Sequence, residues 1–285
     1  MIVLAALAVV ACTSESVQPA AMTDAAAPGS ASAATLEYEG SYGDEPSQFG
    51  RLRLPLDTNT PVPVVVLIHG GFWRAEYGLD LMEPLADDLV NRGYATWNIE
   101  YRRVGEEGGG YPGTLNDVAA AIDELRVLAV TYPLDLTRVV LIGHSAGGQL
   151  AMWAAGREAL AAGQPGAEPL VEPTLAIGLG PVVDLGAADE DGLGDDAVAQ
   201  LLGGHVDEFP DRYAIATPTA TGGATLVVVR GTEDVIVPAE FTEAPSIEGA
   251  ELIDTPGDHF ALIDPTSAAW AAVIAVLDRD SPASP

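Results

Sequence analysis

The 285-residue sequence contains no lysine: all twelve of its basic residues are arginine, set against 42 acidic residues. A formal charge of −30 repels phosphate backbones, which argues against a nucleic-acid partner. We interpret the charge as a solvated acidic surface that aids solubility or salt tolerance. The alternative is the steering of a cationic substrate, which would require acidic residues gathered at the mouth of a site.

Cysteine is also nearly absent, and the one cysteine, Cys12, excludes an internal disulfide framework. The apolar run before it, residues 2–11, is too short to span a bilayer, which takes about 20 residues. The run ends in Val9-Val10-Ala11-Cys12, which resembles the lipobox of bacterial lipoprotein signal peptides. That resemblance implies cleavage after residue 11 and lipid attachment at Cys12, with the protein exported and anchored on the outer side of the cell membrane. The alternative is a cytoplasmic protein with a buried or frayed apolar N-terminus.

Large apolar residues are scarce from residue 12 to residue 35, where Ala, Ser, Thr and Pro predominate without periodicity. Such a segment cannot bury enough surface to offset chain entropy, so it predicts a flexible tether. The remainder, residues 36–280, is long enough for one domain with a large core.

Short apolar runs alternate with stretches of helical spacing throughout this domain. The runs predict strands at residues 36–38, 49–54, 62–68, 94–99, 139–142, 175–179, 226–229 and 251–253. Helical spacing predicts helices at residues 79–91, 115–130, 146–157 and 267–277. The alternation predicts an α/β fold: a doubly wound, mostly parallel sheet with helices on both faces, opened by an antiparallel pair. Residues 182–223 are acidic and Gly-rich, break the rhythm and predict a small cap over the strand ends.

The motif Gly143-His144-Ser145-Ala146-Gly147 follows a buried apolar run and precedes a helical stretch. This is the G-x-S-x-G pattern in a strand–turn–helix context, where glycines permit a turn that holds the serine above the sheet edge. The helix that follows directs its positive end at a developing oxyanion. The motif therefore predicts Ser145 as a nucleophile.

A second motif, His69-Gly70-Gly71-Phe72-Trp73, directly follows the apolar run at residues 62–68. Glycines here let the backbone approach a substrate, as in the HGG loops that supply oxyanion-hole donors. We expect Gly70, Gly71 and Phe72 to form the oxyanion hole together with Ala146. For His69 we favour a bracing hydrogen bond over a metal or base role, because no cluster of metal ligands surrounds it.

In α/β-hydrolases, whose nucleophile motif this sequence resembles, the acid and the base of the triad follow the nucleophile along the chain. The run at residues 226–229 leads into a segment that resembles the G-x-x-D-x-x-V-P segment carrying the acid in many α/β-hydrolases, with Asp234 as its aspartate. His259 follows 25 residues later, just beyond a short apolar run. We therefore predict Asp234 as the acid that orients His259, the general base. No metal and no organic cofactor are needed for this chemistry.

Three rivals for these roles are weaker. His205 precedes the acid and lies in the expected cap. Glu233 is one residue out of register, and Asp258 adjoins the histidine too closely to bond its ring in the usual geometry.

Other residues give less specific signals. Trp73 and Tyr111 are candidates to line an aromatic acyl or leaving-group site, with core packing as the equal alternative. Arg102 and Arg103 are candidates to bind a substrate carboxylate, although ion pairs with nearby acids are favoured.

The segments HGGFW, NIEYRRVGEEGGGYPGTLNDV, GHSAGG and DHFALIDP together resemble bacterial α/β-hydrolases related to kynurenine formamidase and to acetyl-esterase-like enzymes. The resemblance spans about residues 36–277 and implies small acyl esters or aryl formamides as substrates. Our first hypothesis is a serine hydrolase that cleaves small carboxylic esters through an acyl-enzyme on Ser145. Two alternatives remain open: an aryl formamidase, and a catalytically inactive hydrolase fold that serves as a binding module.

Overall fold

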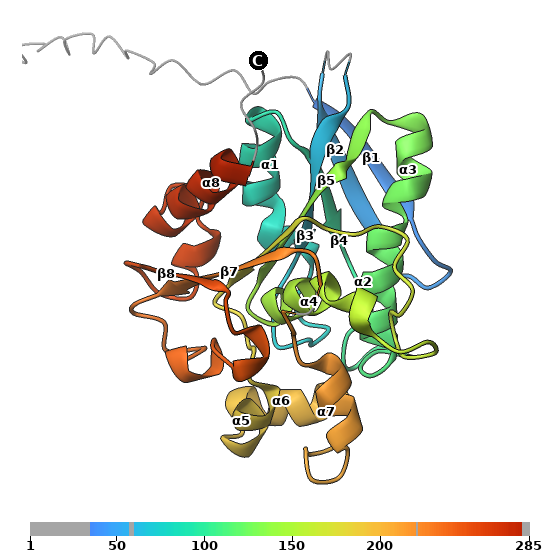
Figure 1. The fold of residues 1–285 in the computed structure, drawn as a ribbon. Coiled ribbons are helices and arrows are strands. Elements are labelled where there is room, and N and C mark those ends of the chain that lie inside the picture. Colours follow the sequence, from blue (N-terminus) through green and yellow to red (C-terminus); the bar gives the residue numbers. More distant parts are fainter. Residues whose placement is uncertain (1–34, 57–59, 221, 281–285) are drawn as a thin grey trace, which may run out of the picture. The chain divides into compact units, whose positions relative to one another are not determined.

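The computed structural model describes residues 35–56, 60–220 and 222–280, and these residues form an eight-stranded sheet flanked by helices (Figure 1). The strand order is β1-β2-β4-β3-β5-β6-β7-β8. The predicted signal peptide and most of the predicted tether lie outside the described residues. Thr35, expected to end the tether, already belongs to the first strand.

The first two strands are antiparallel to their neighbours, and every pairing from β4 to β8 is parallel. The strand bounds are β1 Thr35–Ser41, β2 Phe49–Pro55, β3 Val62–Ile68, β4 Ala95–Ile99, β5 Leu134–His144, β6 Leu175–Leu179, β7 Thr225–Gly231 and β8 Glu251–Thr255. Every predicted strand is present, and the mostly parallel α/β architecture is confirmed. The long β5 begins five residues earlier than its apolar core indicates.

Side chains alternate between the two faces of the central strands, and each face has its own core. Val64 and Val66 of β3 belong to a cluster packed beneath one layer of helices, whereas Val65 and Leu67 belong to a second cluster on the opposite face. All four valine and leucine side chains are fully buried. Burial on both faces explains why this strand reads as a continuous apolar run.

Helices α1 and α8 cover one face, and α2, α3 and α4 cover the other (Figure 1). Their bounds are α1 Glu83–Asn91, α2 Gly113–Asp123, α3 Leu125–Thr131, α4 Ala146–Ala155 and α8 Ala268–Asp280. The predicted helix at 79–91 begins as a 3-10 turn, Leu79–Met82, because Pro84 lacks the N–H that would extend the α-helix backwards. The predicted helix at 115–130 is two helices that meet at Glu124.

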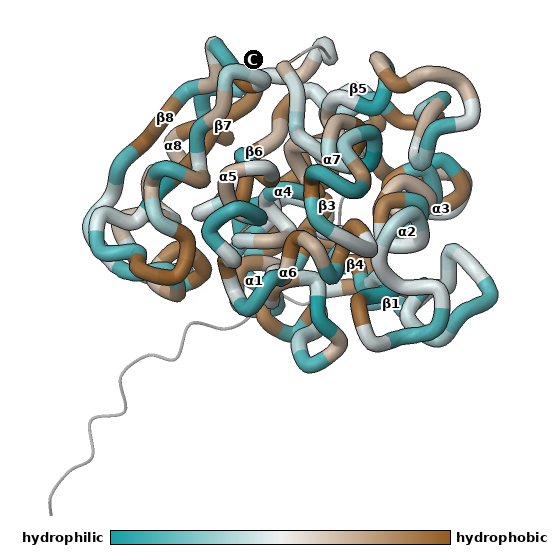
Figure 2. The backbone as a smooth tube through the Cα atoms, turned by 90° about the horizontal axis from the view of Figure 1, so that it is seen from below, coloured by the Kyte–Doolittle hydropathy of each residue, from teal (hydrophilic) through white to brown (hydrophobic). Residues whose placement is uncertain are grey.

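The predicted cap comprises three short helices, α5 Leu185–Glu190, α6 Leu193–Leu202 and α7 Pro210–Ala216. They lie below the strand ends in Figure 1 and in front of β3 and β6 in Figure 2, which views the fold from below. The guanidinium of Arg74 binds the carbonyl of Gly194, 2.5 Å away, which links the loop after β3 to the start of α6. Within the described ranges, no helix is both long and apolar enough to cross a membrane.

Candidate active site

The turn after β5 places Ser145 at the N-terminus of α4 in a conformation that few residues adopt. Its φ of 56° and ψ of −122° are characteristic of a strained strand-to-helix turn. A Cβ at Gly143 would overlap the carbonyl oxygen of Gly147, and a Cβ at Gly147 would overlap that of Ile68. These two glycines are therefore required for β3, β5 and α4 to approach closely enough to form the turn that holds Ser145 at the end of the sheet.

The loops after β7 and β8 bring the predicted acid and base together. His259 Nδ1 lies 2.6 Å from Asp234 Oδ2, and both side chains are buried. The other carboxylate oxygen, Oδ1, accepts backbone N–H groups of Ile236 and Val237 at 2.9 Å each. Burial raises the pKa of Asp234, but the hydrogen bonds from His259 and from the backbone outweigh it and hold that pKa below its usual value. The acid is therefore ionised and fixes the imidazole with a proton on Nδ1.

One cavity of about 80 Å³ contains both Ser145 and His259. The remaining lining is mainly apolar and comes from the HGG loop, the segment before α1 and the loops after β7 and β8. The lining residues are Gly71, Phe72, Tyr77, Leu81, His144, Ser145, Ile236, His259 and Phe260. A small apolar cavity with a few convergent polar groups has the character of a small-molecule site.

The HGG loop presents backbone donors to this cavity. Within the described part of the chain, the N–H groups of Gly71, Phe72 and Ala146 have no acceptor. Gly71 and Phe72 have φ values of 108° and 53°, so the loop turns through left-handed conformations as it passes the cavity. Gly70 packs against the nucleophile, since a Cβ there would lie 2.9 Å from Ser145 Cβ, and its N–H also has no acceptor among the described residues. Free donors of this kind beside the serine are what an oxyanion hole requires.

A buried charged network that sequence reasoning missed lies behind this loop. The ring nitrogens of His69 face the carbonyl of Gly70 and a carboxylate oxygen of Glu100, each at 2.8 Å. Glu100 also forms an ion pair of 3.0 Å with Arg103 and accepts the N–H of Leu79. Burial raises the pKa of Glu100, but His69 and Arg103 together hold it below its usual value. This network braces the oxyanion loop, as expected for His69.

His144 was also passed over, although it stands inside the nucleophile motif. Its ring is buried and lines the cavity, and Nε2 donates to the backbone carbonyl of His259 at 3.0 Å. The spacing of the motif specifies the glycines and the serine but says nothing of this middle position, so the sequence carried no signal for it.

The weaker candidates for substrate contact lie away from the cavity. Trp73 is fully buried, with its indole N–H donating to Gln149, so it belongs to the core rather than to a substrate site. Tyr111 packs against the guanidinium of Arg212 in the cap and is not among the lining residues.

The two arginines after β4 are occupied by carboxylates. Arg102 pairs with Asp117 at 2.8 Å, and Arg103 pairs with Glu100 and Glu106. The preference for ion pairs over substrate binding is therefore supported, although the pairs are more buried than surface pairs would be.

The three rivals to the triad have other partners. His205 lies on the cap, where Nδ1 is 3.1 Å from Asp189 and its side chain is half exposed. Asp258 caps the turn that follows it by accepting two backbone N–H groups, and Glu233 is exposed beside that turn. None of the three approaches the imidazole of His259 in the described contacts.

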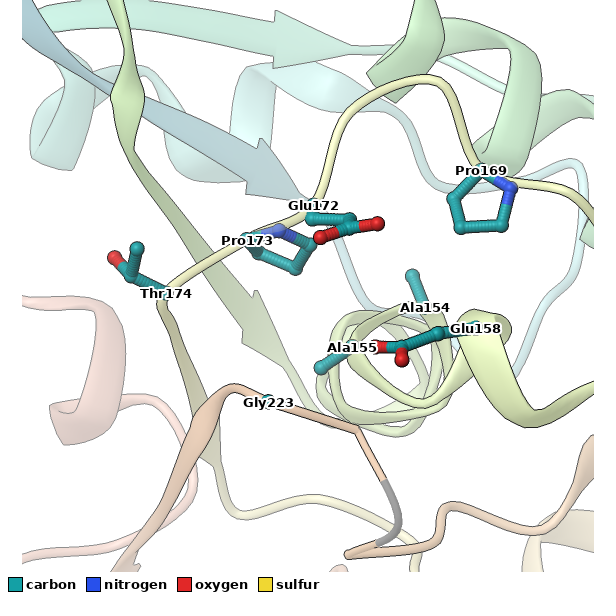
Figure 3. A pocket seen from close by; sticks show the side chains of 8 residues that line it. All are labelled: Ala154, Ala155, Glu158, Pro169, Glu172, Pro173, Thr174 and Gly223. Carbon is teal, nitrogen blue, oxygen red and sulfur yellow. The ribbon is translucent and has the colours of Figure 1, made fainter.

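A larger hollow, of about 240 Å³, lies at the opposite end of α4 (Figure 3). Glu158 stands at the end of the helix, and Pro169, Glu172 and Pro173 lie on the segment that passes over it. This hollow has two exposed carboxylates, but no serine, cysteine or histidine lines it. The described residues contain no cluster of three or more histidine, cysteine or acidic side chains placed to hold a metal.

Comparison with known proteins finds one family model that matches most of the chain and one partial relative. A model of the BD-FAE family matches residues 51–245. The chain is 33% identical over 114 residues to the probable isoprenylcysteine alpha-carbonyl methylesterase ICME of Oryza sativa subsp. japonica. That match covers 39% of this chain and 26% of the rice protein, so the chain spans about a quarter of its relative.

Solved structures share the fold at low sequence identity. The bifunctional GH43-CE protein from Bacteroides eggerthii superposes with a TM-score of 0.69 at 22% identity, over 88% of this chain and 38% of that one. Esterase B from Lactobacillus rhamnosis, in a structure with a tributyrin phosphonate inhibitor, gives a TM-score of 0.71 at 21% identity, over 86% and 84% of the two chains.

Proposed function

Because this chain belongs to the BD-FAE family, an esterase family of α/β-hydrolase fold, we propose that it is a serine hydrolase that cleaves small carboxylic esters through an acyl-enzyme on Ser145. The observation that carries the proposal is the hydrogen bond of 2.6 Å between His259 and Asp234 at a cavity that Ser145 also lines. Ser145 follows β5, Asp234 follows β7 and His259 follows β8, so all three lie at the carboxyl edge of the sheet.

The proposed reaction runs in two stages. His259 takes the hydroxyl proton as Ser145 Oγ attacks the ester carbonyl, and Asp234 stabilises the imidazolium that forms. The free N–H groups of Gly71, Phe72 and Ala146 bind the oxyanion. His259 then returns the proton to the departing alcohol, and water that His259 deprotonates cleaves the acyl-enzyme, releasing the acid and free Ser145.

The volume of the cavity favours a short acyl group. A cavity of about 80 Å³ is about half the size of the cavity of about 150 Å³ that holds a benzene ring, so it has room for only a few heavy atoms. Two large side chains at its rim, Tyr77 and Phe260, are 45% and 54% exposed, so the alcohol portion of a substrate meets an apolar surface. We therefore propose acetyl-sized acyl groups on alcohols of varied size.

A substrate panel tests this proposal. The kcat/KM for p-nitrophenyl acetate is expected to exceed that for the butyrate by about tenfold and that for the benzoate by more. A preference for benzoate would contradict the size argument, and hydrolysis that survives in Ser145→Ala would contradict the acyl-enzyme.

The same panel separates the alternatives that the sequence left open. A kcat/KM on N-formyl-kynurenine above that on every ester would replace the esterase proposal with the formamidase. Well-folded protein that is unreactive with esters, formamides and a fluorophosphonate would favour the inactive binding module.

The anchor at Cys12 also remains our proposal. We expect mass spectrometry of the membrane fraction to show a chain that begins at a lipid-modified Cys12. Soluble protein with an unmodified Cys12 would contradict the anchor and leave the catalytic proposal untouched.

A further inference from the structure

His144 lies between the two loops that must cooperate in catalysis, although it belongs to neither. Its ring centroid is 4.4 Å from that of His259, with the planes tilted by 45°. On the other side, a Cβ placed on Gly70 would lie 3.0 Å from His144 Nδ1, so the ring also rests against the oxyanion loop. The ring thus separates the loop that carries the base from the loop that carries the oxyanion donors, directly beside Ser145.

The hydrogen bonding of this ring is one-sided. A carbonyl oxygen can only accept, so the contact of 3.0 Å with the backbone oxygen of His259 requires a proton on His144 Nε2. The neutral ring then has a bare nitrogen at Nδ1, which is buried and has no partner among the described residues. Buried polar atoms usually have a partner, and among the described residues the hydrogen bond that fixes this ring is the one made by Nε2.

We propose that His144 is a positioning residue: its Nε2–H holds the backbone carbonyl of His259, and its ring sets the separation of the base loop from the oxyanion loop. The proposal rests on the proposed serine-hydrolase function. His144 does not touch the reacting atoms in this role; it acts through the placement of His259. A small displacement of a catalytic group can cost about 100-fold in rate, so one hydrogen bond that fixes the backbone of His259 can have a large effect on kcat.

The charge state of the ring fits this role. Burial, together with the neighbouring ring of His259, lowers the pKa of His144 to about 3, while Asp234 opposes that shift and His69 adds to it. The ring is therefore neutral at neutral pH. A cation 4.4 Å from His259 would oppose the positive charge that His259 takes up when it accepts the serine proton.

Two substitutions of His144 separate positioning from bulk structure. His144→Leu removes the donor, whereas the amide of His144→Gln reaches toward the position of Nε2 and retains a donor. We expect kcat on p-nitrophenyl acetate to fall about 30-fold in His144→Leu with KM changed less than about threefold, and to recover to within about fivefold of wild type in His144→Gln. His205→Leu is the matched control, because His205 lies on the cap outside the cavity, and we expect its kcat to equal that of wild type.

A spectroscopic readout keeps the test independent of turnover. The proton that His259 Nδ1 shares with Asp234 is expected as a downfield proton resonance, which moves or broadens in His144→Leu and is restored in His144→Gln. If wild-type protein shows this resonance yet hydrolyses nothing, the proposed function fails while the positioning role is still tested by the resonance.

Two outcomes would overturn the role of His144. One is a folded His144→Leu variant with wild-type kcat and an unmoved resonance. The other is a loss of kcat that is the same in His144→Leu and His144→Gln at equal thermal stability, which would show that the ring matters for packing alone.

Discussion

Helix α4 begins at the cavity of about 80 Å³ that contains Ser145 and ends beside the hollow of about 240 Å³ that contains Glu158 and Glu172. At the first end, the loops after β3, β5, β7 and β8 converge, and a buried hydrogen bond joins Asp234 and His259 beside Ser145. At the second end, two exposed carboxylates lie on a surface of small residues and two prolines. The larger hollow is therefore the poorer candidate, which shows that convergence of strand ends, and not volume, identifies the site.

The polarity of the helix strengthens this contrast. Its N-terminus carries a partial positive charge and free N–H groups, which favour a developing oxyanion beside Ser145. Its C-terminus carries a partial negative charge, to which Glu158 adds its own negative charge. Only the first end can stabilise the charge that ester cleavage creates.

The largest expected effect comes from the acid at the catalytic end. In Asp234→Asn the imidazole loses the carboxylate that fixes its tautomer, and we expect kcat on p-nitrophenyl acetate to fall by about 10⁴-fold. The matched control is Asp258→Asn. Asp258 adjoins His259 in sequence and caps the turn after it, and the amide oxygen of asparagine can still accept the same backbone N–H groups. Equal losses in both variants would show that Asp234 is not specifically the acid.

A glycine at each end of α4 gives the next comparison. At Gly71, φ is 108° and a Cβ would overlap Tyr77, so Gly71→Ala must shift the loop and its donors. We expect kcat to fall by about 100-fold, close to the loss of one oxyanion donor. At Gly223, in the far hollow, a Cβ would meet nothing within 4 Å, and Gly223→Ala is expected to keep wild-type kcat. A tolerant Gly71→Ala would place the oxyanion hole elsewhere.

Stability against pH provides a third comparison, between two histidines. Because the pKa of His144 is lowered to about 3, the unfolded chain binds a proton between about pH 6.5 and 3 that the folded chain does not. Stability therefore falls on acidification, by about 2 kcal/mol between pH 6.5 and 5. Urea unfolding at these two pH values should show a smaller loss in His144→Gln, and an unchanged loss would contradict the buried neutral ring.

His205 should behave with the opposite sign in the same experiment. Its hydrogen bond to Asp189 raises its pKa, so the stabilisation is present at low pH and is lost as the pH rises through the raised pKa. His205→Gln should therefore lose stability at pH 5 relative to wild type but not at pH 8.

The smallest effect belongs to the far end of the helix. The double variant Glu158→Gln and Glu172→Gln removes both carboxylates of the larger hollow. We expect kcat and KM on p-nitrophenyl acetate to stay within about twofold of wild type, because exposed substitutions away from a site rarely matter. A loss above tenfold would show that the two hollows are coupled.

Much of this architecture follows from the sequence, because the spacing of apolar residues and the positions of glycines are local features. The continuous apolar run at residues 62–68 and the glycines around Ser145 specify a buried strand and a tight turn without reference to the rest of the chain. Asp234 and His259 could be placed for a related reason: each follows a parallel strand, and the ends of such strands share one edge of the sheet.

The contacts that the sequence did not predict are made by side chains on irregular segments, whose directions depend on the local backbone. Trp73 was a candidate for the substrate site, but its φ of 55° turns the indole into the core, where it meets Gln149. Glu100 follows β4 and His69 follows β3. The two side chains meet only because these strands pair side by side in the sheet. Such partners depend on the tertiary fold and leave no local pattern.

The central claim is that Ser145 is the nucleophile, and its most direct test is covalent. The full-length protein is treated with a fluorophosphonate, its intact mass is measured, and the modified peptide is mapped, with and without competition by a short-chain ester. We expect one adduct per chain, located on Ser145 and reduced by the ester. An adduct at another residue, or folded protein that stays unmodified, would contradict it.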